Sequence, residues 1–444
     1  MNAVRDAAFE RFRSQGFPSR KVERYKYTDM AKLFAPDYGL NLSRLPIPVD
    51  PYEAFRCDVP NLSTLLYFMV NDQFYGGQTG GKMAVTDGHR EERGEHLSAP
   101  KLPAGVVIGP LAEHEELAQP YYNRMAAKDE AAVSDLNTML AQDALLVYVP
   151  RGVKIERTVQ VINILKAPPL WGRAGEEGLM VNRRVLIILE EGAEAKLLFC
   201  DHAADDCHFL TTQVIEAFVG PRAALDLYCL EETHHKNVRV SNVYIDQQQD
   251  SRVNHNVITL HNGITRNKLD LTLSGEGAQC GCYGCVIADK QQHVDNNTLI
   301  VHRVPHCTSN QLYKYVLDEQ ATGAFAGRVL VEQGAQQTVS QMTNQNLCAT
   351  REARMYTQPM LEIYADDVKC AHGCTVGQLN DAALFYMRQR GIPLREARLL
   401  LETAFINEVI DKMELQPLRD RLHHLVDKRF RGELSKCKGC KLCR

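Results

Sequence analysis

The stretch from Leu145 to about Asn346 constrains the fold most, because it contains no convincing long amphipathic helix. Short apolar, β-branched runs recur there roughly every 10–16 residues, with Gly, Asn and Asp between them. One of them, Leu269–Leu273, alternates strictly between apolar and polar residues, as a strand with one buried face does. The clearest others are Val185–Leu189, Ala195–Cys200, Val214–Val219, Leu225–Leu230, Val238–Ile245 and Val253–Leu260.

Three architectures fit such a run of short strands: a sandwich, a barrel and a parallel β-helix. Most neighbouring runs are not joined by a two-residue hairpin turn, and Asn262–Gly263 is the exception. That favours a solenoid, whose coils join parallel strands without hairpins, although no repeat of fixed length is visible. We therefore predict a mainly β chain with a parallel β-helix core.

Helical patterns occur on both sides of this core. Val4–Phe12 and much of 111–140 have helical spacing. A capping-box pattern, Thr375 to Gln378, predicts a helix start, and Pro393–Met413 and Pro417–Phe430 predict two more helices. The expected domains are a mixed, largely helical region 1–144, a β-helix core 145–374, a helical region 375–430 and a basic, Cys-rich tail 431–444.

Charge and hydropathy exclude several classes of protein. Acidic residues number 55 and basic residues 51, so the net charge is −4. This near balance argues against a protein that coats nucleic acid, because such domains are usually strongly basic. No apolar stretch approaches the ~18 residues of a membrane span, and Met1–Gln15 lacks a secretory apolar region. We expect a cytoplasmic protein that binds neither nucleic acid nor membrane.

A glycine-rich loop, Gly76–Lys82, matches GxxxxGK, but Met83 follows where a phosphate loop needs Ser or Thr. The following residues also do not form a helical pattern. We interpret it as an ordinary loop and expect any ATP site to lie in a partner.

The chain has 14 cysteines, and in a reducing compartment clustered thiols tend to bind metal or react. Cys437, Cys440 and Cys443 form C-x₂-C-x₂-C, a spacing that suits a soft metal or an iron–sulfur cluster. The alternative is a reactive tail without metal. Cys280, Cys282 and Cys285 are interpreted as small core residues. Paired histidines such as His234–His235 lack the spacing of a ligand set.

The most specific stretch is 361–378, where an apolar strand runs into Asp366 and Asp367 and then into Cys370-x-His372-x-Cys374. If the backbone is extended, the two thiols and the imidazole point the same way. Such a set suits zinc, copper or an iron–sulfur intermediate. The alternative is that the carboxylates cap a turn and the thiols pack.

A different class is a β-helix enzyme that acts on polysaccharide, with Asp366 and Asp367 as acid and base. Adjacent strand residues point to opposite faces, which is poor geometry for paired carboxylates. A third possibility is a redox protein whose tail carries a permanent cluster.

Three segments resemble the SufD branch of the SufB/SufD family, the scaffold proteins of the SUF iron–sulfur cluster assembly system. They are LEIYADDVKCAHGCTVGQLNDAALFYMRQRGI at 361–392, FPSRKVERYKYTDMAKL at 17–33 and VDNNTLIVHRVPHCTSNQLYK at 294–314. Together they span nearly the whole chain. A SufB-like paralogue is the nearest alternative, but that branch usually reads His-Glu-Ala where this chain has His372-Gly-Cys374.

The resemblance implies a right-handed parallel β-helix in a non-catalytic scaffold. It implies pairing with a SufB-like subunit, or a homodimer, and docking of a SufC-like ATPase on the C-terminal helices. It places His372 at the subunit interface, where it helps to hold a transient iron–sulfur cluster or iron, and does not decide whether a flavin binds. Cys370 matches a family cysteine, Cys374 stands where the family usually has Ala, and the cysteine-rich tail is not a family feature.

Overall fold

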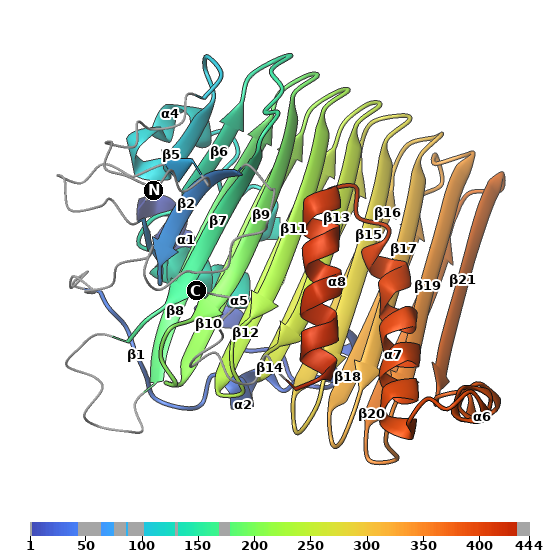
Figure 1. The fold of residues 1–444 in the computed structure, drawn as a ribbon. Coiled ribbons are helices and arrows are strands. Elements are labelled where there is room, and N and C mark those ends of the chain that lie inside the picture. Colours follow the sequence, from blue (N-terminus) through green and yellow to red (C-terminus); the bar gives the residue numbers. More distant parts are fainter. Residues whose placement is uncertain are drawn as a thin grey trace.

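The computed structural model describes residues 2–42, 64–74, 86–87, 102–128, 132–167 and 178–432. Its dominant feature is a stack of parallel strands that runs through most of the described chain (Figure 1). The glycine-rich loop Gly76–Lys82 and the tail cysteines Cys437, Cys440 and Cys443 lie outside the described residues.

The strands form two sheets, and the chain crosses from one to the other after almost every strand. The even sheet contains β6 (Leu145–Val149), β8 (Gly178–Leu189), β10 (Phe209–Val219), β12 (Asn237–Gln247), β14 (Ile264–Leu273), β16 (His293–His302), β18 (Thr322–Val331) and β20 (Arg354–Ile363). The odd sheet contains β2 (Thr64–Val70), β7 (Thr158–Leu165), β9 (Glu194–Ala203), β11 (Ala224–Glu232), β13 (Arg252–His261), β15 (Gln279–Ala288), β17 (Thr308–Leu317), β19 (Thr338–Cys348) and β21 (Val368–Gly377).

Each strand from β8 onward pairs in parallel with the strand two places along the chain, which confirms the predicted parallel β-helix. The repeat length varies because the turns differ. Val238 pairs with Ile264, an offset of 26 residues, whereas Thr322 pairs with Arg354, an offset of 32. The sequence therefore shows no repeat of fixed length because the turns differ in length, although the strands that they connect pair residue by residue along the stack.

The first end of the solenoid is closed by antiparallel pairs. β5 (Val107–Pro110) pairs antiparallel with β6, and β3 (Gln73–Phe74) and β4 (Thr86–Asp87) pair antiparallel with β2. β1 (Tyr38–Gly39) adds to the start of β8. Within the described ranges, antiparallel pairing therefore occupies much of the strand edge that this end would offer to a further coil.

Alternate side chains of both sheets point inward and form one apolar core along the stack. Cys280 and Cys282 belong to this core, while Cys285 lies on the outer face of β15 under the C-terminal helices. All three are buried, which confirms their interpretation as core residues.

Inward positions near the start of the solenoid carry an ionic cluster, defined as Arg183, Asp201, Glu231, Arg239 and His255, all buried. Asp201 pairs with Arg183 Nη1 at 2.6 Å and with Arg239 Nε at 2.9 Å. Burial alone would raise the pKa of Asp201, but the two guanidinium charges outweigh it and lower the pKa. Burial raises the pKa of Glu231 to about 7 and lowers that of His255 to about 4.

Helices cover the outer faces. α7 (Leu394–Ile410) and α8 (Gln416–Phe430) pack on the odd sheet through their apolar stripes (Figure 1). Segments from the first part of the chain pack on the even sheet, among them α2 (Met30–Leu33), α4 (Glu115–Ala118) and α5 (Ala132–Leu140), with α1 (Asn2–Gln15) against α5. No helix within the described ranges is long and apolar enough to cross a membrane.

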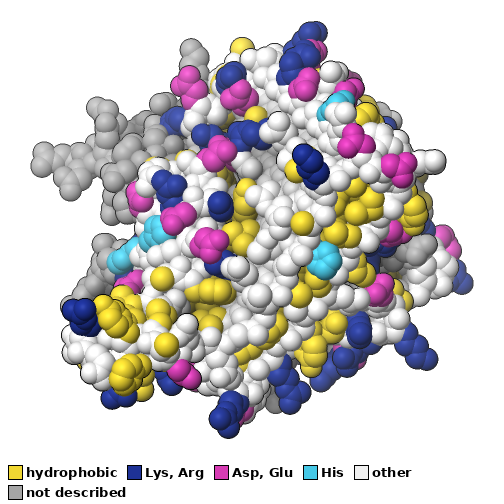
Figure 2. Space-filling view, turned by 90° about the vertical axis from the view of Figure 1, so that its right-hand side faces the viewer, with side chains coloured by type: hydrophobic (Ala, Val, Ile, Leu, Met, Phe, Trp, Pro, Cys, Tyr) yellow, Lys and Arg dark blue, Asp and Glu magenta, His cyan; other side chains and the backbone are white. Residues whose placement is uncertain are grey.

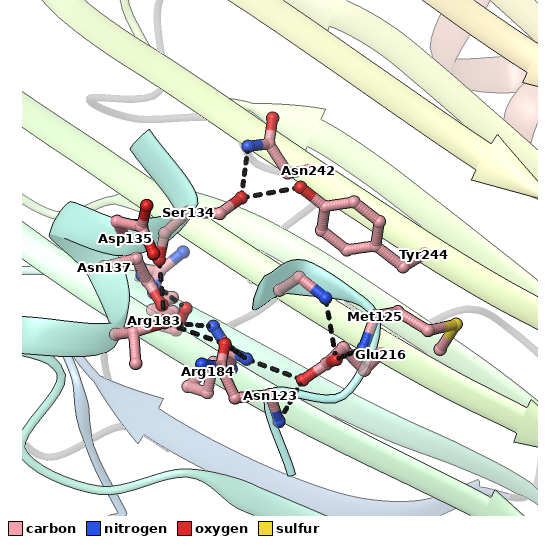
Figure 3. Close-up of polar contacts among 12 residues, drawn as sticks. Asn123, Met125, Ser134, Asp135, Asn137, Arg183, Arg184, Glu216, Asn242 and Tyr244 are labelled. Atoms are coloured by element: carbon pink, nitrogen blue, oxygen red, sulfur yellow. Dashed lines mark hydrogen bonds and ion pairs between the residues drawn. The ribbon is translucent and has the colours of Figure 1, made fainter. Parts of the chain in front are cut away.

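A buried carboxylate attaches the segment around Asn123–Ala126 to the even sheet. Glu216 of β10 accepts the backbone N–H groups of Asn123 and Met125, each at 2.8 Å, and pairs with Arg184 at 2.6 Å (Figure 3). Both charged side chains are only 1% exposed. A buried pair of this kind needs further hydrogen bonds to offset its desolvation, and Arg184 donates in addition to Thr138 Oγ1 at 3.0 Å and to Asn123 Oδ1 at 3.1 Å.

The prediction of a helix start at Thr375 is wrong. Residues 375–377 continue β21 and pair with 345–347 of β19. The helix α6 spans Asp381–Gln389, and the side chain of Asn380 caps it by accepting the N–H of Ala383. The other two C-terminal helices begin within one residue of their predicted starts. The four-domain division of the chain stays a prediction.

Candidate functional site

The far end of the solenoid is open. Among the described residues, β20 pairs only with β18 and β21 only with β19, so each strand leaves one backbone edge unpaired. Unpaired strand edges are templates for a further strand from another molecule. β21 is exposed along most of its length, whereas alternate residues of its neighbour β19 are buried.

β21 carries the predicted ligand set at alternate positions. Cys370, His372 and Cys374 pair in register with Ser340, Met342 and Asn344 of β19, which are buried and face the solenoid interior. The three side chains therefore share the inward face at the open end, as we predicted for an extended backbone. His372 and Cys374 are exposed, whereas Cys370 is half-buried against the core.

The two thiols differ in environment. Burial raises the pKa of the Cys370 thiol, a shift that a backbone hydrogen bond with Ser340 partly opposes. Cys370 is therefore a protonated thiol near neutral pH and must lose its proton to bind a metal. Cys374 is an exposed free thiol.

The three residues do not make a complete metal site. Alternate residues of a strand lie about 6.6 Å apart, and the first and third about 13 Å apart, whereas zinc–sulfur bonds are about 2.3 Å long. In agreement, no three His, Cys, Asp or Glu side chains of the described residues are placed to hold one metal ion. A site at this end requires ligands from a second molecule.

Asp366 and Asp367 lie in the turn between β20 and β21 and are exposed. The backbone N–H of Asp367 donates to Gln336 Oε1 at 2.9 Å, and its carbonyl accepts from Gln337 N–H at 2.6 Å. The turn therefore stacks on the preceding turn of the solenoid. This arrangement favours a role in the turn over an acid–base pair acting on a substrate.

Apolar side chains surround the open end (Figure 2). Ile363, Tyr364 and Val376 are 40%, 59% and 51% exposed at the ends of the last two strands. On α6, Phe385 and Tyr386 are 65% and 59% exposed. Sequence analysis missed these two, although the run Leu384–Met387 is more apolar than a helix covering one core face requires.

The N-terminal segment 17–33 reaches this end across the outer face of the even sheet. The ring of Tyr27 stacks on Tyr356 of β20 at 5.0 Å between centroids, and its hydroxyl lies 3.3 Å from Gln358. Thr28 donates to Asp295 of β16 at 2.6 Å. Two of the segments that carry the family resemblance are thus in contact in the fold.

Comparison with known proteins agrees with this geometry. The family model described as the SUF system FeS cluster assembly SufBD core domain matches residues 172–405, and the SufBD protein N-terminal region matches residues 1–161. An iron–sulfur cluster assembly SufBD family protein of Synechocystis is 26% identical over 433 residues, covering 95% of this chain and 89% of its own.

Two relatives are named as the iron–sulfur cluster assembly protein SufD. That of Escherichia coli is 28% identical over 67% of this chain and 69% of its own, and that of Bacillus subtilis is 22% identical over 73% of each. The solenoid, its flanking segments and the matched models together show that this chain belongs to the SufBD family of SUF iron–sulfur cluster assembly proteins.

Proposed function

We propose that this chain is a SufD-type scaffold subunit, which supports cluster assembly without catalysing a reaction itself. The observation that carries the proposal is the open solenoid end, where Cys370, His372 and Cys374 share one inward face beside unpaired strand edges. Iron and sulfide are the cargo of such a site. The cytoplasmic location expected from the sequence is part of the proposal.

The partner at the open end is a SufB-like subunit. Its terminal strands would add to the free edges of β20 and β21 by main-chain hydrogen bonds and continue both sheets across the interface. The exposed Ile363, Tyr364 and Val376 would be buried there. The partner would supply the thiolate ligands that the strand geometry denies to His372 and Cys370 alone.

The ATPase partner docks on the C-terminal helices. α6 exposes Phe385 and Tyr386, and α7 exposes Leu394 and Leu400 at 41% and 44%. Only residues 378–380 separate β21 from α6, so a displacement of α6 acts directly on the strand that carries His372. ATP-driven movement of the partner would thereby open the interface to incoming iron and sulfide.

Replacement of His372 tests the ligand role. The His372→Ala subunit is co-expressed with SufB-like and SufC-like partners, with His208→Ala, an exposed histidine remote from the open end, as the matched control. We expect the complex to assemble in both cases, and iron and sulfide per complex to fall sharply only in His372→Ala. A normal rate of cluster formation in that variant contradicts the proposal.

A further inference from the structure

A groove on the outer face of the even sheet, the basic groove, takes no part in the proposed function. It crosses β8 to β16, whereas α7 and α8 cover the other sheet (Figure 1), and β18 and β20 separate it from the open end. We propose that the basic groove binds an extended, acidic peptide segment of a partner protein, with Arg124 as the central carboxylate-binding residue. This interaction goes beyond the scaffold role and depends on neither of the partners proposed for it.

The basic groove consists of two connected hollows, with volumes of about 500 Å³ and about 460 Å³. Both are lined by Arg124, Phe218, Asp246 and Gln248, so one continues into the other. Together they cross five neighbouring strands of the even sheet, which is about 19 Å at a strand spacing of about 4.8 Å. An extended peptide rises about 3.3 Å per residue, so a segment of about six residues fits this length. A groove of this shape suits a peptide better than a compact small molecule.

The basic groove is cationic, although the net charge of the whole chain is −4. Four cationic and two anionic side chains line its larger hollow, which gives a net charge of +2. They are Arg24, Arg124, Lys128, Arg303, Asp246 and Asp270. Arg24 pairs with Asp270 at 2.5 Å. Within the described ranges, the exposed side chains of Arg124 and Lys128 have no carboxylate partner, so they are available to carboxylates of another molecule.

The backbone that carries Arg124 is held in place by the even sheet. The buried carboxylate of Glu216 accepts the N–H groups of Asn123 and Met125, each at 2.8 Å, and thereby fixes the residues on both sides of Arg124 (Figure 3). The guanidinium group is therefore presented from a rigid backbone. Such preorganisation reduces the entropy that is lost when a ligand binds.

The floor between these cations is largely apolar. Phe218 of β10 and Leu299 of β16 are half-buried and line it. Asp246 also lies there, but its carboxylate accepts from Ser274 Oγ at 2.5 Å and from Gln248 Nε2 at 2.8 Å, so donors of this chain already stabilise its charge. A matching ligand needs apolar side chains for the floor and carboxylates for the rim. An acidic peptide with apolar residues provides both, whereas a polyphosphate leaves the floor unmatched.

Peptide binding to the full-length chain tests the proposal. The probe is the fluorescein-labelled hexapeptide EDFEDL, and its binding is measured by fluorescence anisotropy. Two control peptides remove one property each: NQFNQL has no side-chain charge, and EDSEDS has no apolar side chain. The chain is used unmodified and as Arg124→Glu and Arg351→Glu, where Arg351 is an exposed arginine that lines neither hollow. Circular dichroism and the unfolding midpoint establish that both variants are folded.

We expect EDFEDL to bind at one site per chain, with an affinity that falls as salt is added, and both control peptides to bind more weakly. Arg124→Glu should weaken EDFEDL binding by about tenfold or more, because it removes a charge-assisted hydrogen bond and adds a like charge, and Arg351→Glu should leave it unchanged. Any of three results overturns the proposal. They are no binding of EDFEDL, equal affinities of Arg124→Glu and Arg351→Glu for it, and its displacement by an equal concentration of tripolyphosphate, which would identify a phosphate site instead.

Discussion

Asp201 is the residue on which the interior ionic cluster depends. Its side chain is 4% exposed and lies between Arg183 and Arg239, which are 1% and 6% exposed, and it also accepts from Asn163 Nδ2 at 2.9 Å. Asp201→Asn keeps the shape but removes the charge, so two buried guanidinium groups lose their shared counter-ion. Breaking a buried pair in this way costs about 3–5 kcal/mol.

Part of this loss is recovered inside the cluster. Glu231, whose pKa burial raises to about 7, lies close enough to Arg239 for their charges to interact, and it ionises more readily once the neighbouring Asp201 charge is gone. We therefore expect a decrease in the free energy of unfolding near the lower limit, about 3 kcal/mol at pH 7.

Guanidinium-induced unfolding measures the effect, with Asp206→Asn as the matched control. Asp206 pairs with Lys236 at 3.1 Å but is 65% exposed, and exposed pairs contribute about 0–1 kcal/mol. The change in the free energy of unfolding of each variant equals the shift in its guanidinium midpoint multiplied by the mean m-value, the slope of the free energy of unfolding against denaturant concentration. If Asp201→Asn destabilises the protein no more than Asp206→Asn, the cluster does not hold the first coils together.

Three further predictions concern buried groups. Burial lowers the pKa of His255 to about 4, so its contribution to the free energy of unfolding is complete above about pH 6.5 and is lost as the pH falls toward 4, at about 1.4 kcal/mol per pH unit. His255→Gln should therefore reduce the dependence of the free energy of unfolding on pH. Urea unfolding between pH 6.5 and 4.5 measures this dependence, and an unchanged dependence in the variant contradicts the reasoning. A Cβ on Gly284 would lie 2.1 Å from the buried Tyr313 ring, so Gly284→Ala should cost about 1–3 kcal/mol by the same measurement, whereas Gly334→Ala, with its nearest neighbour at 3.9 Å, should cost little. Glu216→Gln should release the segment that contains Asn123 and Met125 from the even sheet, which is measured as earlier proteolysis in this segment than in Asp206→Asn; equal cleavage rates of the two variants would exclude this attachment.

The strand pattern predicted the solenoid because strands that are buried on both faces require continuous apolar, β-branched runs, and such runs are visible in the sequence. It also predicted that Cys370, His372 and Cys374 share a face, since the two-residue period of a strand is purely local. The helix start at Thr375 could not be predicted in the same way. Pairing of 375–377 with β19 is a long-range contact, and it overrides a local capping pattern.

The site as a whole was less predictable. The ionic cluster depends on how the two sheets face each other, because Arg183 of β8 and Asp201 of β9 meet across the solenoid interior. A groove of about 940 Å³, lined by His235, Gln292 and Glu319 among others, likewise depends on turns that are distant in sequence. No repeating pattern of neighbouring residues indicates the ionic cluster or the groove, because both depend on how coils of unequal length are placed relative to one another.

The asymmetry of the two solenoid ends limits what the chain can build. One end is closed by antiparallel strands, and the other presents free parallel edges. A stack with two open ends would add subunits without limit and form filaments. A stack with a single open end can join only one other end, so association through it stops at a pair of subunits. The antiparallel pairs that β3, β4 and β5 make at the closed end therefore favour an assembly that stops at two subunits joined through their open ends.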